Sequence, residues 1–193
     1  MKKTTNKFWS VAMIIACLTT TIMFSGCEKT PPLFRVIKAS ELISLEEAAT
    51  LLEQSINESE PGNGIFSDEI TYRSNDYHLM IILNQEALHD KNSDFEKKLL
   101  KDGWKNYLKE MEKNIVPYTT RIEIGSDGTA YLQEGWGFGQ WLLYVFSGDY
   151  YINLTLGNKS LSYEDTPEEI LWKQEKIAES AKLAIKNLKA ILK

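Results

Sequence analysis

Apolar residues recur at the spacing of amphipathic helices in three stretches of the chain. These predict helices over residues 45–58, 93–114 and 167–192. Each stretch begins with a residue that can cap a helix: Ser44, Ser93 and Thr166. Glu47 and Glu96 lie three residues after their caps, which is the spacing of a capping box. Pro167 at the first position of the last helix is typical of a helix start.

Between the helices, β-branched and aromatic residues form short runs bounded by turn residues. These runs predict six strands, over residues 65–73, 77–83, 119–124, 129–134, 140–146 and 150–156. Pro61–Gly64 is predicted to be a loop, and the apolar run Trp141–Phe146 an interior strand covered on both faces. The fold class is therefore α+β: a mainly antiparallel sheet of about six strands, flanked by two long helices and a short N-terminal helix.

The N-terminal segment has the pattern of a targeting signal. Lysines at positions 2, 3 and 7 precede an apolar core, Phe8–Met23, which at 16 residues is short for a spanning helix. The run Phe24-Ser25-Gly26-Cys27 then resembles the lipobox of bacterial lipoproteins, in which the cysteine is diacylglycerylated before the signal is cleaved. Ile14–Cys17 matches the same pattern, but cleavage there would leave an apolar core of only about eight residues. We therefore expect lipidation at Cys27.

This expectation divides the chain into a signal peptide (1–26), a lipidated cysteine with its tether (27–35) and one domain (36–193). Acyl chains such as palmitate on Cys27 would anchor the protein in membrane lipid. The expected location is the bacterial cell envelope, either the outer side of the cytoplasmic membrane or the outer membrane. Because Cys17 leaves with the signal, the domain keeps no thiol for a disulfide, a metal or catalysis.

The charge balance argues against a nucleic-acid partner. The whole chain has a formal charge of −5, and removal of the three N-terminal lysines leaves 19 basic against 27 acidic side chains. Nucleic-acid binding needs a basic surface that displaces counterions. Lysines do give the last helix a basic side, which we expect to be solvated: Lys173, Lys176, Lys182, Lys186, Lys189 and Lys193.

Three phrases of the domain resemble small bacterial secreted lipoproteins with the PsbP-like fold. They are Ala39–Ala48, Asp127–Leu132 and Leu143–Ile152, the last preceding a closing helix rich in Ala and Lys. The resemblance covers nearly all of the domain and implies the PsbP-like α+β fold. It also implies an adaptor or accessory subunit more often than an enzyme, although fold alone does not fix function.

The strongest candidate for a binding patch is the aromatic loop that carries Trp136, Phe138 and Trp141. Its glycines, within Gly135–Gly139, lie between two strands rather than between a strand and a helix, so they do not form a dinucleotide-binding loop. If exposed, these aromatic side chains would offer a contact for a partner. Packing in the core is the alternative explanation.

No catalytic residue is assigned from the sequence. Glu86, His89 and Asp90 can share one helical turn, but a solvated turn explains them better than a metal site, and the other histidine, His78, is predicted to lie on a strand. We expect no metal and no cofactor. The sequence thus predicts a membrane-anchored lipoprotein with a non-catalytic binding or accessory domain, whose partner is an unknown envelope protein or ligand. The alternative is an envelope hydrolase that uses unassigned carboxylates.

Overall fold

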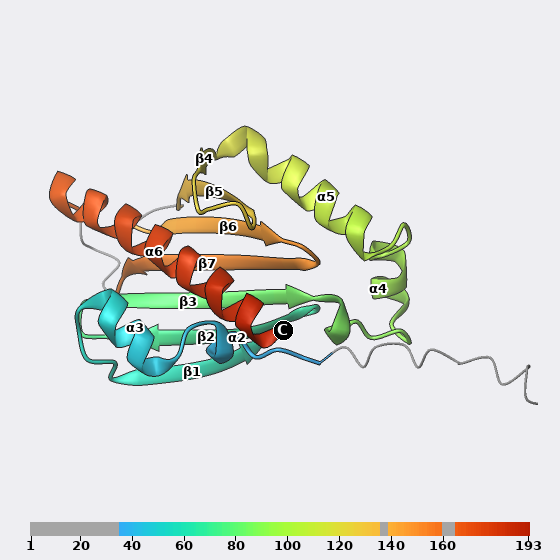
Figure 1. Ribbon diagram of the computed structural model, residues 1–193, viewed down its shortest axis with the longest axis horizontal. Coiled ribbons are helices and arrows are strands. Elements are labelled where there is room, and N and C mark those ends of the chain that lie inside the picture. The colour runs from blue at the N-terminus through green and yellow to red at the C-terminus, as the bar shows by residue number, and fades with distance from the viewer. Residues whose placement is uncertain (1–34, 136–138, 160–164) are drawn as a thin grey trace, which may run out of the picture. The chain divides into compact units, whose positions relative to one another are not determined.

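An antiparallel sheet of seven strands crosses the computed structural model, which describes residues 35–135, 139–159 and 165–193 (Figure 1). Residues 36–193 form one compact unit. The strands are β1 (Glu58–Asn63), β2 (Ser67–Arg73), β3 (Tyr77–Gln85), β4 (Thr120–Ile122), β5 (Thr129–Glu134), β6 (Trp141–Ser147) and β7 (Tyr150–Asn158). Their order across the sheet is β1-β2-β3-β7-β6-β5-β4. The α+β class and the antiparallel sheet are confirmed, with one strand more than expected.

The additional strand is β1, which includes the predicted loop Pro61–Gly64 in part. It pairs with β2 at the edge of the sheet, and all of its side chains are exposed. An edge strand tolerates proline, because one side of its backbone needs no partner in the ladder. With no buried face, β1 has no apolar alternation by which the sequence would reveal it.

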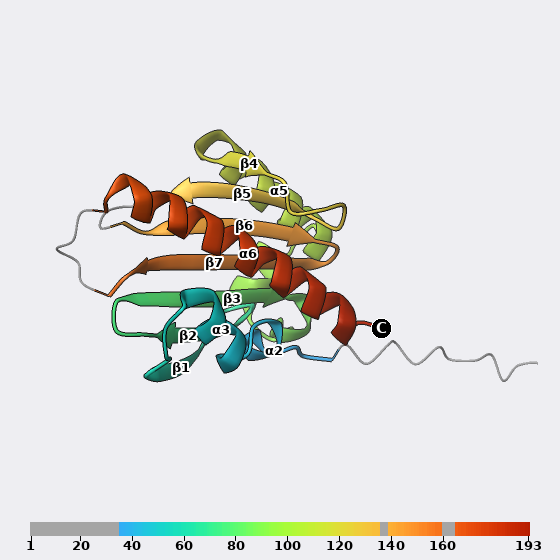
Figure 2. The same cartoon turned by 60° about the vertical axis from the view of Figure 1, so that its left-hand side comes forward.

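Helices α2 (Ala39–Leu42), α3 (Leu45–Leu52) and α6 (Pro167–Ile191) lie together over one face of the sheet (Figure 2). The capping box predicted at Ser44 is present, and the cap predicted at Thr166 is present as well, where Glu169 completes a capping box. Helix α3 is shorter than expected, because Glu53 takes a left-handed conformation with φ of 55° and ends it. The helix predicted over residues 93–114 is divided into α4 (Asp94–Leu99) and α5 (Trp104–Ile115). Gly103, with φ of 84°, lies between them.

Alternation along the strands places one buried layer on each side of the sheet. Leu143, Val145, Ile152 and Leu154 face α6 and belong to the main core, together with Ile177 of α6. The side chains between them on the strands point to the opposite face, as the period of two requires. Strand β6 is an interior strand, as predicted, but the face opposite α6 is only half-covered.

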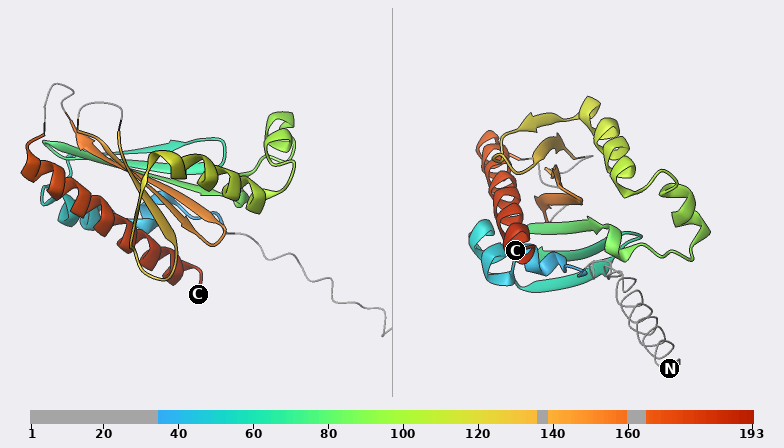
Figure 3. Two further views of the ribbon diagram at one scale, coloured as in Figure 1. Left: turned by 90° about the horizontal axis from the view of Figure 1, so that it is seen from above. Right: turned by 45° about the vertical axis from the view of Figure 1, so that its right-hand side comes forward.

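The opposite face is covered in part by α5, so that the sheet lies between α6 and α5 (Figure 3). The buried members of this smaller cluster are Phe66, Trp104, Leu108 and Tyr151. Phe146 stacks on Tyr151 with ring centroids 4.8 Å apart. Three of its four buried members are aromatic, and the cluster packs α5 against the sheet.

Helix α6 corrects one expectation from the sequence. Lys173 is not on a solvated basic side: its side chain is fully buried and forms an ion pair with Asp165. Ser180 is buried as well, whereas Leu192, expected in the apolar stripe, is exposed. The buried face of α6 therefore includes a charged group.

Candidate functional site

Helix α5 is held on the sheet at its first turn and toward its C-terminal end. At the first turn, the indole N–H of Trp104 donates a hydrogen bond of 2.8 Å to the backbone oxygen of Asp149, in the turn between β6 and β7. Trp104 also stacks on Tyr107 of the same helix, and both rings meet Phe66 edge to face. Such pairs add stability beyond the area that they bury.

Toward its C-terminal end, α5 is fixed by a carboxylate. Glu112 Oε1 accepts hydrogen bonds from the hydroxyl groups of Tyr131, at 2.8 Å, and Thr129, at 2.9 Å, both on β5. Burial, together with the Glu112 carboxylate, raises the pKa of Tyr131, so its hydroxyl stays protonated and continues to donate. Two anchors therefore define the position of α5, and its remaining face is left open.

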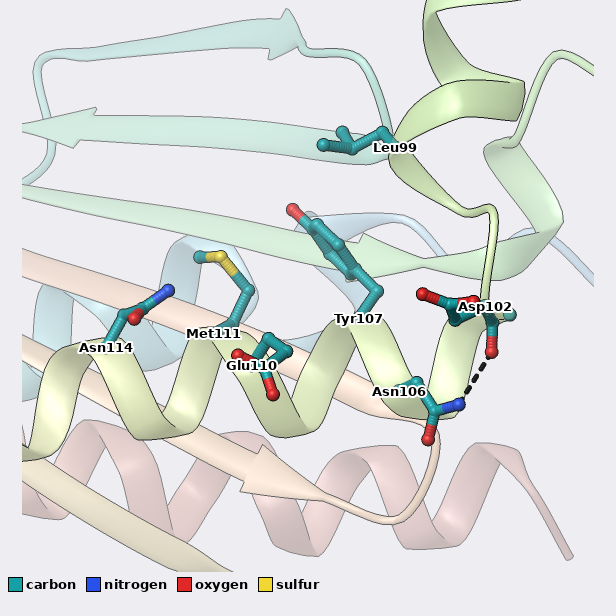
Figure 4. A pocket seen from close by; sticks show the side chains of 8 residues that line it. Leu99, Asp102, Asn106, Tyr107, Glu110, Met111 and Asn114 are labelled. Carbon is teal, nitrogen blue, oxygen red and sulfur yellow. Dashed lines mark hydrogen bonds between the residues drawn. The ribbon is translucent and has the colours of Figure 1, made fainter.

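Beside α5 lies a depression of about 270 Å³, which we call the α5 hollow (Figure 4). It is lined by Leu99, Asp102, Gly103, Asn106, Tyr107, Glu110, Met111 and Asn114. Tyr107 and Met111 point from α5 toward the same space as Leu99, which comes from the end of α4 (Figure 4). The break at Gly103 creates this shape, because an uninterrupted helix would carry Leu99 along the axis of α5.

The α5 hollow combines apolar and acidic lining. Its apolar side chains are Leu99, Tyr107 and Met111, while Asp102 and Glu110 supply carboxylates and none of the lining residues is a cation. Lys113 Nζ lies 3.7 Å from Glu110 Oε2. Both side chains are largely exposed, so this ion pair contributes little to stability. The hollow therefore favours an apolar group that carries or neighbours a positive charge.

Exposed apolar side chains also occur on α4 and after the C-terminal end of α5. Phe95 is 61% exposed and Leu99 is 42% exposed, and their spacing of four residues places them on one face of α4. Val116 and Tyr118 are exposed after the other end of α5, in the short turn Val116–Tyr118. Exposed apolar side chains that share one face, as Phe95 and Leu99 do, are a common mark of an interaction site.

The turn that contains Glu86, His89 and Asp90 has a different arrangement from that of a metal site. His89 Nδ1 contacts Glu96 Oε2 at 2.8 Å, and the same oxygen accepts from the backbone N–H of Asp90 at 2.7 Å. Ser93 caps α4 as predicted, but the carboxylate of Glu96 turns to His89 instead of completing the capping box. In the described part of the chain, no group of three or more His, Cys, Asp or Glu residues is arranged to hold a metal ion.

His78 lies on β3, half-buried, on the sheet face opposite α6. Burial lowers its pKa, and the positive charges of Arg73 and Lys173 lower it further, against a hydrogen bond with the backbone of Asn158 that raises it. The ring is therefore neutral in the folded protein near neutral pH. It lies against Gly157, where an added Cβ would meet the ring at 2.8 Å.

Of the residues predicted for a binding patch, the structure describes Trp141 alone. It begins β6, is half-buried and packs against the main core. Trp136 and Phe138 lie outside the described residues, as does the predicted lipidation site Cys27. The patch and the anchor remain predictions. No described helix is long and apolar enough to cross a membrane.

Comparisons with known proteins give little more. No protein-family model matches the chain, and no curated protein matches it. Among solved structures, a GTP binding regulator from Thermotoga maritima superposes with a TM-score of 0.35 and 6% identity, over 75% of this chain and 92% of that one. A likeness this distant carries no argument about function, so the function has to be argued from the site.

Proposed function

We propose that this protein is a lipoprotein of the bacterial cell envelope, anchored through acylated Cys27, whose domain binds another envelope protein without catalysis. The α5 hollow is the observation that carries the proposal. We propose further that the domain has the PsbP-like fold, which the antiparallel sheet and the closing helix α6 support.

The size of the hollow favours a protein partner over a small-molecule ligand. Pockets for drug-sized ligands span about 300–1,000 Å³, whereas the α5 hollow has about 270 Å³. That space accepts one or two large apolar side chains from a partner, and Leu99, which lines it, is 42% exposed. The carboxylates of Asp102 and Glu110 favour a segment with Lys or Arg next to its apolar residues.

The other buried or half-buried carboxylates already have structural partners, which favours binding over carboxylate catalysis. Glu112 holds two hydroxyl groups of β5, Glu96 holds His89, and Glu47 completes the cap of α3. Asp68 accepts from the backbone N–H of Ala39 and pairs with Lys38. Each of these groups is explained by the fold.

Site-specific photo-crosslinking in intact cells tests the proposal. A photoreactive amino acid replaces Asn106, which lines the hollow, or Lys182, an exposed residue of α6 on the other side of the sheet. We expect the Asn106 probe to give a crosslinked product with one protein partner, and the Lys182 probe to give no product with that protein. Crosslinks to the same protein from both positions, or from neither, would contradict the proposed site.

A further inference from the structure

The ion pair between Lys173 and Asp165 has features that an ordinary structural ion pair does not need. The Lys173 side chain is 0% exposed and that of Asp165 is 4% exposed, although burial of two charges is costly. Lys173 Nζ lies 2.5 Å from Asp165 Oδ1 and donates to the backbone oxygen of Gly139 at 2.9 Å. The amine is thus held in a fixed position, away from water.

A third side chain completes the arrangement. Asn158, at the end of β7 and 7% exposed, donates from Nδ2 to the same Oδ1 of Asp165 at 2.8 Å. One carboxylate oxygen therefore holds both an amine and a carboxamide. The other oxygen, Oδ2, is buried and has no hydrogen-bond partner within the described residues, so it is free to carry a proton.

We propose that Lys173 and Asn158 form an intramolecular isopeptide bond, with Asp165 as the acid that moves the protons. Transfer of one proton from the Lys173 ammonium to Asp165 gives a neutral amine, which is the nucleophilic form, and a carboxylic acid. It also removes two opposite charges from a buried site. Half a turn of the Asn158 carboxamide then presents its oxygen to the acid.

The reaction balances without any other reagent. The Asp165 proton polarises the Asn158 carbonyl, and the lone pair of Lys173 Nζ forms a bond to Cγ. Asp165 passes a proton from the new amide nitrogen to Nδ2, the bond from Cγ to Nδ2 breaks, and ammonia leaves. The ammonia takes the carboxyl proton away as ammonium, which restores the Asp165 carboxylate. Fixed proximity supplies much of the rate for such a step, and exclusion of water protects Cγ from hydrolysis.

The bond would join the end of β7 to α6 across residues 159–172. Residues 36–193 contain no cysteine, so the domain has none with which to form a disulfide. An isopeptide bond would crosslink the domain in the same sense, by restricting the unfolded chain. The inference does not depend on the α5 hollow, so the two proposals can fail separately.

Tryptic digestion and mass spectrometry of the full chain, extracted in detergent, test the inference. Trypsin cleaves after Arg121, Lys159, Lys173 and Lys176, but an amide on Lys173 blocks cleavage there. We expect a branched product that joins 122–159 to 160–176 and is lighter by one ammonia than its two parts. Separate peptides that end at Lys159 and Lys173, both unmodified, would overturn the inference, as would a loss of water that joins Lys173 to Asp165.

Variants test the role of the carboxyl group. Asp165→Asn and Asp165→Ala should each restore cleavage after Lys173 and abolish the branched product. Lys105→Ala is the matched control, because Lys105 pairs with the exposed Asp149 and its loss should leave the branched product unchanged. A branched product that persists in both Asp165 variants would overturn the assignment of Asp165 as the acid.

Discussion

Trp104 and Asp149 are joined by a hydrogen bond of 2.8 Å from the indole N–H to a backbone oxygen, which ties α5 to the turn between β6 and β7. The Trp104 side chain is buried in the aromatic cluster, so the bond lies at the edge of a packed region. Because the α5 hollow is formed by α5 and the chain before it, its shape depends on this attachment.

Trp104 should therefore stabilise the domain through two contributions, the packing of its ring and its hydrogen bond, which two different substitutions can separate. Trp104→Ala removes the ring from the aromatic cluster and should lower the free energy of unfolding by about 3–5 kcal/mol. Trp104→Phe keeps a ring but loses the hydrogen bond, and should cost about 1–2 kcal/mol. Urea unfolding followed by circular dichroism measures both. If both variants lower the free energy of unfolding by the same amount, the packing of the ring contributes nothing beyond the hydrogen bond.

The second anchor is tested by a double-mutant cycle between Glu112 and Tyr131. Glu112→Ala and Tyr131→Phe each remove one partner of the same hydrogen bond, and each should cost about 1–2 kcal/mol. The double variant should cost less than the sum of the two, because the second change removes nothing further from that bond. Strict additivity in urea unfolding would mean that the bond does not hold α5 to β5.

The lowered pKa of His78 leads us to predict that the stability of the domain depends on pH. Its pKa is lowered in the folded state by burial and by Arg73, so below the unfolded value of 6.5 the unfolded chain binds a proton that the folded chain does not. The contribution of His78 to the free energy of unfolding is thus complete above pH 6.5. It is lost as the pH falls from there toward the lowered pKa of the folded state.

We expect His78→Gln to reduce the fall in stability between pH 7 and 5 relative to the wild type. The difference between the two unfolding curves isolates His78 from His89 and from the carboxylates, which both proteins share. A difference that stays constant over this range would contradict a lowered pKa at His78.

The proposed lipid anchor leads to a prediction of its own. Cys27→Ser should abolish incorporation of labelled palmitate and release the protein from the membrane fraction, because stable anchoring needs the acyl chains. Cys17→Ser is the matched control and should leave labelling unchanged. Labelling that persists in Cys27→Ser and disappears in Cys17→Ser would move the site to Cys17.

Local chemistry explains what could be predicted from the sequence. The caps at Ser44 and Thr166 act through backbone amides within one turn, so the sequence nearby is sufficient to predict them. The hairpin of β2 and β3, and that of β6 and β7 around Gly148, follow in the same way from alternation and turn residues.

The features that were missed depend on contacts between distant segments. Lys173 resembles any surface lysine of a helix until Asp165 and the backbone of Gly139 are brought beside it. The α5 hollow arises from the break at Gly103 and from the angle at which Leu99 then stands, which helical periodicity does not specify. Helical periodicity predicts that Tyr107 and Met111 face the sheet, but not that they also line an open hollow.

The most direct test of the binding function is capture of the partner by crosslinking in intact cells, compared across three variants. Leu99→Asp places a charge in the α5 hollow, while Leu45→Asp does the same on α3, where the leucine is 45% exposed against 42% for Leu99. The third variant, Trp136→Ala/Phe138→Ala, alters the aromatic loop. We predict that only Leu99→Asp loses the partner captured by the wild type. Loss in Trp136→Ala/Phe138→Ala with retention in Leu99→Asp would contradict this account and place the contact on the aromatic loop.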